Sequence, residues 1–327
     1  MNNTILRGIS LPLLWLLAIC SCKKEISMNV IDGLPDEQLL DVGTYEGSGQ
    51  CVHPDVIYFP TAYQGNRFYM AFTPYPFSND KFENPCLVKS NNGVDFTELW
   101  NGLNPLAKAP SYDHNDDPDL HFNPKTGKFY LYYLETMRPD SQNLICLESA
   151  DWSSFTKHTA IHFEIATNDP FILSPAYLAL NDDAGYRLYF VTVGDTLHIR
   201  TIYSNDGENW SKAAIEEVYT DLPPSIRPWH VDVFKAPVGY AMLCAGLTTP
   251  GSLLYQKLML GTSLDGMHWH FLEKPLMTSD PEFHGCRSIY RSSGLWIDNK
   301  LAVWYSMMDT NNNWHIGIKK FNTDTLY

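Results

Sequence analysis

Runs of apolar residues, each preceded by a cluster of polar residues, recur along most of the chain, and such runs predict β-strands. Each run is followed, after a turn, by a second run rich in aromatic and β-branched residues. The second runs are Arg67–Thr73, Lys128–Leu134, Arg187–Val193, Tyr240–Ala245 and Lys300–Ser306. These five pairs of strands indicate five repeating units.

The polar clusters that open the first strands repeat one motif at intervals of about sixty residues. They read His53-Pro54-Asp55-Val56, Asp117-Pro118-Asp119-Leu120, Ser174-Pro175-Ala176-Tyr177 and His230-Val231-Asp232-Val233. The fifth unit is the faintest, with a first strand predicted at Ile289–Ile297 and a third at Trp314–Phe321. Equivalent strands at a fixed period converge on one axis in repeat architectures, so these polar side chains should meet there.

A third strand in the first four units runs into a turn that begins with serine and is followed by an aromatic residue. The serines, 55 to 59 residues apart, are Ser90, Ser149, Ser204 and Ser263. Asn-Gly and Asp-Gly in these turns supply the positive φ values of a tight hairpin. The pattern predicts an all-β, five-bladed β-propeller over residues 46–327, with four-stranded antiparallel blades of about 55–64 residues. A two-domain β-sandwich is the alternative, but sandwiches do not repeat one signature in phase.

The beginning of the chain has the pattern of an export signal. A basic residue precedes Ile9–Ile19, an apolar run too short to span a bilayer, and small residues then lead to Cys22. This end resembles the lipobox of bacterial lipoproteins of Bacteroidota type, and an ordinary secretory signal is the alternative. We expect residues 1–21 to be a lipoprotein signal peptide, Cys22 to be lipidated and residues 22–45 to be a tether. The protein should then be anchored to the bacterial cell envelope by its lipid alone, on the periplasmic or surface face of the outer membrane.

Composition narrows the class of partner. The formal net charge is -14 and no cluster of Lys and Arg is present, which argues against nucleic acid. The chain contains 9 Trp and 19 Tyr, which suit blade packing and also suit clefts in which sugars stack on rings. The cysteines after Cys22 have no CxxC spacing, so buried thiols are expected, while a disulfide stays open in an exported protein: Cys51, Cys86, Cys146, Cys244 and Cys286.

The opening motifs of the first two units resemble those of the five-bladed β-propeller glycosidases of family 43 and its relatives in families 32, 62 and 130. The Ser-x-Asp-Gly-x-x-Trp turns at Ser204 and Ser263 resemble the same clan. The resemblance covers residues 45–327, and it implies the fold and a carbohydrate ligand more strongly than an activity. It matches Asp55 to the general base that activates water. The family's acid, a Glu that opens the fourth blade, has no counterpart, because Trp229-His230-Val231-Asp232 stands there.

Three functions remain open after this match. In the first, which we favour, the chain is a divergent glycoside hydrolase that acts on an oligo- or polysaccharide through Asp55, Asp119 and Asp232, with Asp117 and Glu135 as further candidate acids. In the second, the propeller binds glycans without cleaving them. In the third, it is a glycoside phosphorylase whose basic residues hold phosphate: His284, Arg287 and Arg291.

Other polar and aromatic residues are predicted to bind the sugar: His53, Asp117, Trp229, His230, Arg287 and Arg291. His53 and His230 each stand two residues before an aspartate, which puts both side chains of a pair on one face of a strand. The alternative is structural, with the imidazoles satisfied by the same aspartates and Asp55 bonded to backbone N–H groups of a neighbouring blade. No cofactor and no catalytic metal is expected, although the two His-x-Asp pairs leave a structural Ca²⁺ open.

Overall fold

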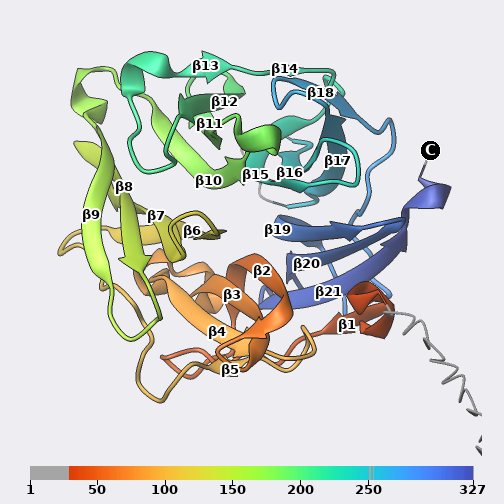
Figure 1. The fold of residues 1–327 in the computed structure, drawn as a ribbon. Coiled ribbons are helices and arrows are strands. Elements are labelled where there is room, and N and C mark those ends of the chain that lie inside the picture. The colour runs from red at the N-terminus through yellow and green to blue at the C-terminus, as the bar shows by residue number, and fades with distance from the viewer. Residues whose placement is uncertain (1–28, 250–251, 253, 327) are drawn as a thin grey trace, which may run out of the picture.

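The computed structural model describes residues 29–249, 252 and 254–326, which form five small sheets around one axis (Figure 1). The predicted all-β, five-bladed propeller of four-stranded antiparallel blades is therefore confirmed. Cys22 and the predicted signal peptide lie outside the described residues. No helix within the described ranges is long and apolar enough to cross a membrane.

Four blades are built from consecutive strands, in order from the axis outwards. Blade 1 consists of β2 (Cys51–Tyr63), β3 (Asn66–Pro74), β4 (Cys86–Ser90) and β5 (Thr97–Glu98). Blade 2 consists of β6 (His114–Asn123), β7 (Lys128–Met137), β8 (Ser141–Ser149) and β9 (Thr156–Phe163). Blade 3 consists of β10 (Phe171–Ala179), β11 (Tyr186–Val193), β12 (Leu197–Ser204) and β13 (Glu216–Glu217). Blade 4 consists of β15 (Arg227–Lys235), β16 (Tyr240–Leu247), β17 (Lys257–Ser263) and β18 (His268–Phe271), with β14 (Tyr219–Thr220) parallel to β18 on its outer edge.

Blade 5 joins the two ends of the described chain. It consists of β19 (Ser288–Ile297), β20 (Lys300–Met308), β21 (Trp314–Asn322) and, outermost, β1 (Glu37–Leu39). The expected tether at residues 22–45 is corrected here, because η1 (Val30–Gly33) and β1 belong to the propeller. Without β1 the backbone of β21 would be an unpaired sheet edge. The other short 3₁₀ turns are η2 (Pro76–Ser78), η3 (Asp80–Phe82), η4 (Ile165–Thr167), η5 (Asn181–Asp183), η6 (Lys212–Ala214) and η7 (Thr323–Thr325).

The serine turns fasten neighbouring blades together. In blades 1, 3 and 4 the serine Oγ accepts a hydrogen bond from the N–H of a glycine three residues on, and that glycine has a positive φ. The glycine carbonyl then accepts from an aromatic side chain of another blade: Trp304 Nε1 to Gly93, Tyr132 Oη to Gly207, and Tyr189 Oη to Gly266. A Cβ on Gly207 would stand 2.1 Å from the Tyr177 hydroxyl, so only glycine fits that turn.

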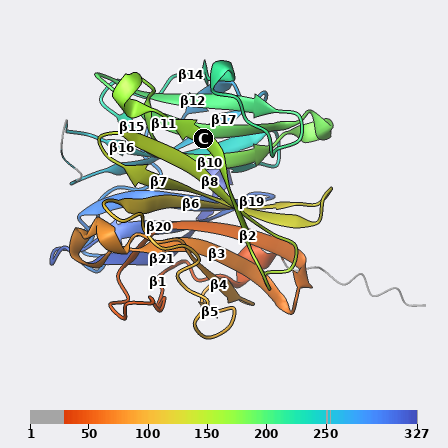
Figure 2. The same cartoon turned by 90° about the vertical axis from the view of Figure 1, so that its left-hand side faces the viewer.

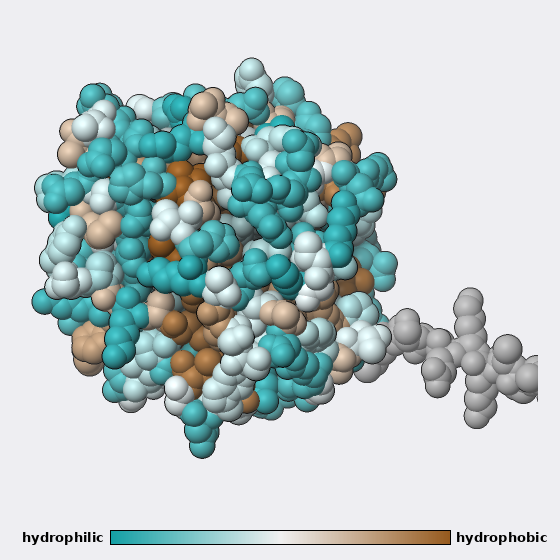
Figure 3. Space-filling model, turned by 60° about the vertical axis from the view of Figure 1, so that its left-hand side comes forward, coloured by the Kyte–Doolittle hydropathy of each residue, from teal (hydrophilic) through white to brown (hydrophobic). Residues whose placement is uncertain are grey.

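The first strands begin, and the second strands end, on one face of the propeller, which we call the start face. The opposite face carries the hairpins that join the first strand to the second in each blade. Figure 2 shows the blades from the side. The apolar side chains are buried between the blades, and in Figure 3 the brown patches are recessed among hydrophilic side chains. The five cysteines of the described chain are free and buried, as predicted.

Candidate functional site

A β-bulge interrupts every first strand near its start, where the pairing with the second strand shifts register. In blades 1 to 3 the bulge holds one non-glycine residue at positive φ: His53 at 57°, Asp117 at 49° and Ser174 at 56°. Such residues are uncommon and concentrate at functional sites, since their strain must be offset by the surrounding structure. The sequence motif that repeats along the chain is therefore the bulge that directs these polar residues to the axis.

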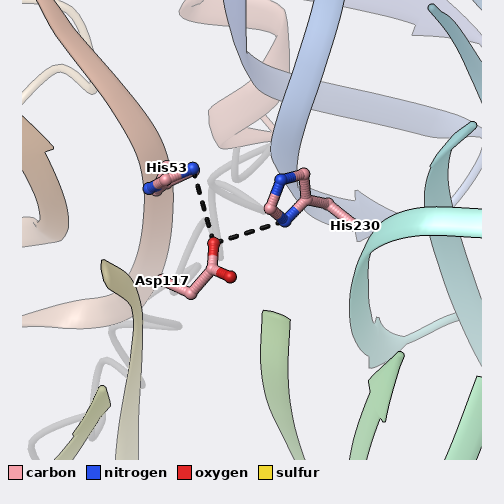
Figure 4. A group of neighbouring side chains, drawn as sticks. All are labelled: His53, Asp117 and His230. Atoms are coloured by element: carbon pink, nitrogen blue, oxygen red, sulfur yellow. Dashed lines mark ion pairs between the residues drawn. The ribbon is translucent and has the colours of Figure 1, made fainter. Parts of the chain in front are cut away.

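Three of the predicted substrate-binding residues converge at the centre of the start face (Figure 4). Oδ1 of Asp117 lies 3.4 Å from Nε2 of His53 and 3.3 Å from Nδ1 of His230. All three side chains are at most 3% exposed. They come from blades 2, 1 and 4, so only closure of the ring brings them together. We call these residues the axial triad.

Neighbouring groups hold the axial triad in place. Nδ1 of His53 lies 3.0 Å from the Thr73 hydroxyl and 3.6 Å from Oε1 of the buried Glu83. Oδ2 of Asp117 accepts a hydrogen bond of 2.8 Å from the backbone N–H of Ser174. The ring of Tyr290 packs against both histidines, with centroids 5.3 Å from His53 and 4.3 Å from His230.

Burial and neighbouring charge set the ionisation of this site. Burial lowers the pKa of His53 to about 3, so its imidazole is neutral at neutral pH. Burial alone would raise the pKa of Asp117, but the neighbouring imidazoles and the Arg291 guanidinium hold that pKa well below its usual range. Burial, and then the charge of Asp116, raise the pKa of Glu83 well above its ordinary value. The site therefore combines a neutral imidazole with an ionised carboxylate.

The axial triad has the donor set and spacing of a metal site. Nε2 of His53, both ring nitrogens of His230 and Oδ1 of Asp117 are buried and make no hydrogen bond within the described structure. Two ligand atoms about 2.0–2.1 Å from a tetrahedral zinc ion stand about 3.3 Å apart. The measured separations from Asp117 Oδ1 are 3.3 and 3.4 Å. Two imidazoles and one carboxylate thus fit a divalent ion, with Arg291 Nη1 the competing cation at 3.5 Å from the same oxygen.

The three predicted catalytic aspartates form a second cluster farther along the first strands. Asp55, Asp119 and Asp232 place carboxylate oxygens within 4.8 Å of one another. Each accepts a hydrogen bond from a backbone N–H of another blade: Asp55 from Leu120, Asp119 from Tyr177 at 3.1 Å, and Asp232 from Gly294 at 2.9 Å. Such contacts are expected if Asp55 has a structural role.

Burial dominates the ionisation of this second cluster. Burial, and then the charge of Asp55, raise the pKa of Asp232 to about 8. The pKa of Asp119 also stands well above its ordinary value, for the same two reasons. Arg291 joins the two clusters, with Nη1 3.5 Å from Asp117 and Nη2 3.7 Å from Asp119. On the side of the opposite face, the aspartates line a cavity of about 270 Å³.

Several predicted residues lie outside the axial triad. Trp229 is half-buried beside it and donates through Nε1 to the hydroxyl of Tyr290 at 3.2 Å. Arg287 instead bonds Asn312 at 3.0 Å, whereas Arg291 faces Asp117 and Asp119. Glu135 pairs with Lys157 at 2.8 Å, away from the axis. Tyr290 was not among the predicted site residues. Its only signal in the sequence is that it directly precedes Arg291 in the first strand of blade 5.

Comparisons with known proteins find one curated relative and several solved structures that are similar to this chain. No family model matches the sequence. A curated relative, an A type blood N-acetyl-α-D-galactosamine deacetylase from Flavonifractor plautii, is 24% identical over 90% of this chain and 45% of its own length. This chain thus spans about half the length of the curated relative it matches.

Two solved structures illustrate the likeness in fold. An N-acetylgalactosamine deacetylase from F. plautii, in complex with blood group B trisaccharide, has a TM-score of 0.77 and 21% identity over 86% of this chain and 94% of its own. A family-43 enzyme from Xanthomonas citri, in complex with xylotriose, has a TM-score of 0.61 and 13% identity over 88% of this chain and 91% of its own. The chain therefore has the five-bladed β-propeller fold seen in family-43 glycoside hydrolases and in this deacetylase.

Proposed function

We propose that this chain is a glycan-active hydrolase in which His53, Asp117 and His230 hold one divalent metal ion, and that it removes the acetyl group from an N-acetylated amino sugar. The observation that carries the proposal is the axial triad, with unpartnered, buried ligand atoms at the spacing of a metal site. The F. plautii relative supports an N-acetylated sugar as the substrate class.

The carboxylates of the second cluster give weaker support to glycosidic bond hydrolysis. Glycosidases hold their two carboxyl groups about 5–5.5 Å apart for retention or about 6.5–9.5 Å apart for inversion. Asp55, Asp119 and Asp232 are a group of three, each with one oxygen within 4.8 Å of the others, and each carboxylate is bonded to a backbone N–H of a neighbouring blade. This cluster is better suited to bracing the blades than to flanking a sugar.

The residues around the axial triad suit amide hydrolysis. A divalent ion held by this donor set, when bound, polarises a carbonyl oxygen and lowers the pKa of a water molecule. Thr73 and Glu83 both face Nδ1 of His53, which fixes the ring and leaves Nε2 directed at Asp117. The Ser174 N–H fixes the other oxygen of Asp117, so Oδ1 remains available as a ligand.

Product analysis on defined glycans tests the proposal. The protein, loaded with Zn²⁺ or Mn²⁺, is incubated with blood group A trisaccharide and with methyl glycosides of N-acetylgalactosamine and N-acetylglucosamine, and acetate and saccharide products are measured. We expect acetate release without shortening of the glycan, and loss of that release after chelation or in Asp117→Asn. Asp36→Asn, at a carboxylate whose side chain is 97% exposed, is the matched control and should keep full activity. Release of shorter saccharides without acetate would contradict deacetylation and favour glycoside hydrolysis, and glycan retention without any product would favour the binding propeller.

Export and lipid anchoring form a further part of the proposal. Asn29, the first of the described residues, bonds through its side chain to the carbonyl of Ile297, at the end of β19 on the face opposite the axial triad. Mass spectrometry of the mature N-terminus, with Cys22→Ser as the soluble comparison, tests the anchor.

A further inference from the structure

We infer that the ring of Phe77 is a stacking platform for a pyranose of the substrate, an inference that rests on the proposed function and adds a residue that selects the sugar. Phe77 lies in the loop of residues 75–85, which connects β3 to β4 on the start face. The loop is connected to the axial triad at two places, directly through Glu83 and indirectly through Tyr75. Tyr75 packs on Trp314, which packs on Tyr290 beside both histidines, and Glu83 lies 3.6 Å from His53.

The loop is held rigidly around Phe77. The N–H of Phe77 donates to Oε1 of the buried Gln50 at 3.0 Å, and this oxygen also accepts from the N–H of Trp314 at 3.3 Å. The Trp314 indole N–H donates to the Ser78 hydroxyl at 2.9 Å. Farther along, Asp80 pairs with Arg138 at 3.2 Å. A phenyl ring on such a loop loses little freedom when a ligand contacts it.

The same loop holds Phe77 in an unfavourable backbone conformation. Phe77 and Ser78 both have positive φ, 53° and 60°, which is rare for a bulky residue and rarer for two in succession. The strain does not serve packing, because the Phe77 side chain is 74% exposed. Within the described chain, Phe77 makes no ring contact, whereas the exposed Tyr219 stacks on His268 with centroids 4.8 Å apart. Strain that is maintained in order to present an apolar ring to solvent points to a ligand.

A pyranose is the ligand that fits this ring. One face of a pyranose carries mainly C–H groups, and aromatic rings in sugar sites contact that face while polar residues bind the hydroxyls. The Phe77 side chain has no polar atom, and its loop contacts His53 through Glu83. When the acetamido group of a glycan reaches the axial triad, Phe77 would contact a sugar ring of the same glycan. The half-buried Trp229, bonded to Tyr290, belongs to blade 4, whereas Phe77 belongs to blade 1.

Kinetics on matched variants test this role. Phe77→Ala should raise KM for acetate release from blood group A trisaccharide by roughly 3- to 10-fold, with kcat nearly unchanged, because a stacking contact supports binding of the ground state and the transition state alike. Phe77→Gly, which relieves the backbone strain, should give the same rise in KM although its Tm is equal or higher. Phe77→Trp should restore KM, and Tyr219→Ala, at an exposed ring on the outer edge of blade 4, should leave it unchanged. Unaltered KM in both Phe77→Ala and Phe77→Gly would overturn the inference and leave the deacetylase proposal standing.

Binding measurements separate failure of this inference from failure of the proposed function. Saturation-transfer NMR with methyl N-acetyl-α-D-galactosaminide should show strong transfer to the C–H protons of one pyranose face, lost in Phe77→Ala and kept in Tyr219→Ala. This result would support the platform even if no acetate were released. Equal transfer in the wild type and in Phe77→Ala, or no transfer in the wild type, would overturn it.

Discussion

Nδ1 of His230 on blade 4 lies 3.3 Å from Oδ1 of Asp117 on blade 2, so two blades that are not neighbours meet across the axis. Neither blade alone sets this distance. It depends on the closed ring, in which β1 is the outermost strand of blade 5. The integrity of the axial triad should thus report on propeller closure as well as on local packing.

Metal titration provides the most direct prediction. Isothermal titration of metal-free protein with Zn²⁺ should show one site per chain, and Asp117→Asn should weaken it at least about 100-fold, because an amide oxygen is a poorer ligand than a carboxylate. Metal at about 100 times Kd should stabilise the fold by about 2.7 kcal/mol. Asp232→Asn, which alters the second cluster, should keep the site. Equal affinity in wild type and Asp117→Asn would remove the axial triad as the metal site.

Closure of the ring gives a second prediction. Ile31 is fully buried and packs, through η1, in the core between blades 5 and 1. Ile31→Ala should lower the free energy of unfolding by about 2–4 kcal/mol, because it leaves a cavity in that core. Chemical denaturation provides the measurement. Leu264→Ala, at a residue 78% exposed, is the control, and equal effects of the two substitutions would show that η1 is not part of the cooperative fold.

The fold could be predicted from the sequence because its determinants are local. Blades 1 to 4 repeat a bulge motif at the start of the first strand and a serine turn after the third, and both are visible as residues at fixed spacing. The fourth strand of blade 5 could not be predicted in this way. β1 is three residues long, lies far from β21 in sequence, and is a strand only because it pairs there.

The axial triad was predicted in part. The sequence placed His53, Asp117 and His230 at the axis, but it could not separate them from Asp55, Asp119 and Asp232, because both sets open the same strands. The bulge separates them, since it turns His53 and Asp117 toward the start face and leaves the later aspartates bonded to backbone. Arg287 was grouped with Arg291 by position alone, and it lies on a loop that pairs with Asn312.

A third prediction concerns Asp55, whose carboxylate accepts from the N–H of Leu120 on blade 2 and from the Ser293 hydroxyl on blade 5 at 3.1 Å. Asp55→Ala should cost about 2–4 kcal/mol of stability, because two buried donors lose their acceptor. The rate of acetate release per folded molecule should stay within about 10-fold of the wild type, since removal of a catalytic acid or base lowers the rate about 10²–10⁴-fold. A stable but inactive Asp55→Ala protein would restore Asp55 as a catalytic base.

The last prediction is a pH dependence at His114, on the start face beside the axial triad. Its Nδ1 faces Asp113, Asp80 and Arg138, and its Nε2 lies 3.0 Å from Asp116. Burial opposes protonation, but the hydrogen bond and charge of Asp116, followed by those of Asp113, raise the pKa of His114 to about 9. The unfolded value is about 6.5. The stability from protonated His114 is therefore fully present below about pH 6.5 and is lost as pH rises through about 9.

Urea denaturation of His114→Gln against the wild type measures this contribution. The substitution should be more destabilising at pH 7 than at pH 10, by about 2 kcal/mol, because the wild type loses its charged imidazole over that interval. His268→Gln, at an imidazole whose side chain is 60% exposed beside Asp265, is the control for loss of an imidazole at the surface. If His114→Gln lowers the free energy of unfolding equally at both pH values, His114 stabilises the fold by packing and not by its charge interaction with Asp113 and Asp116.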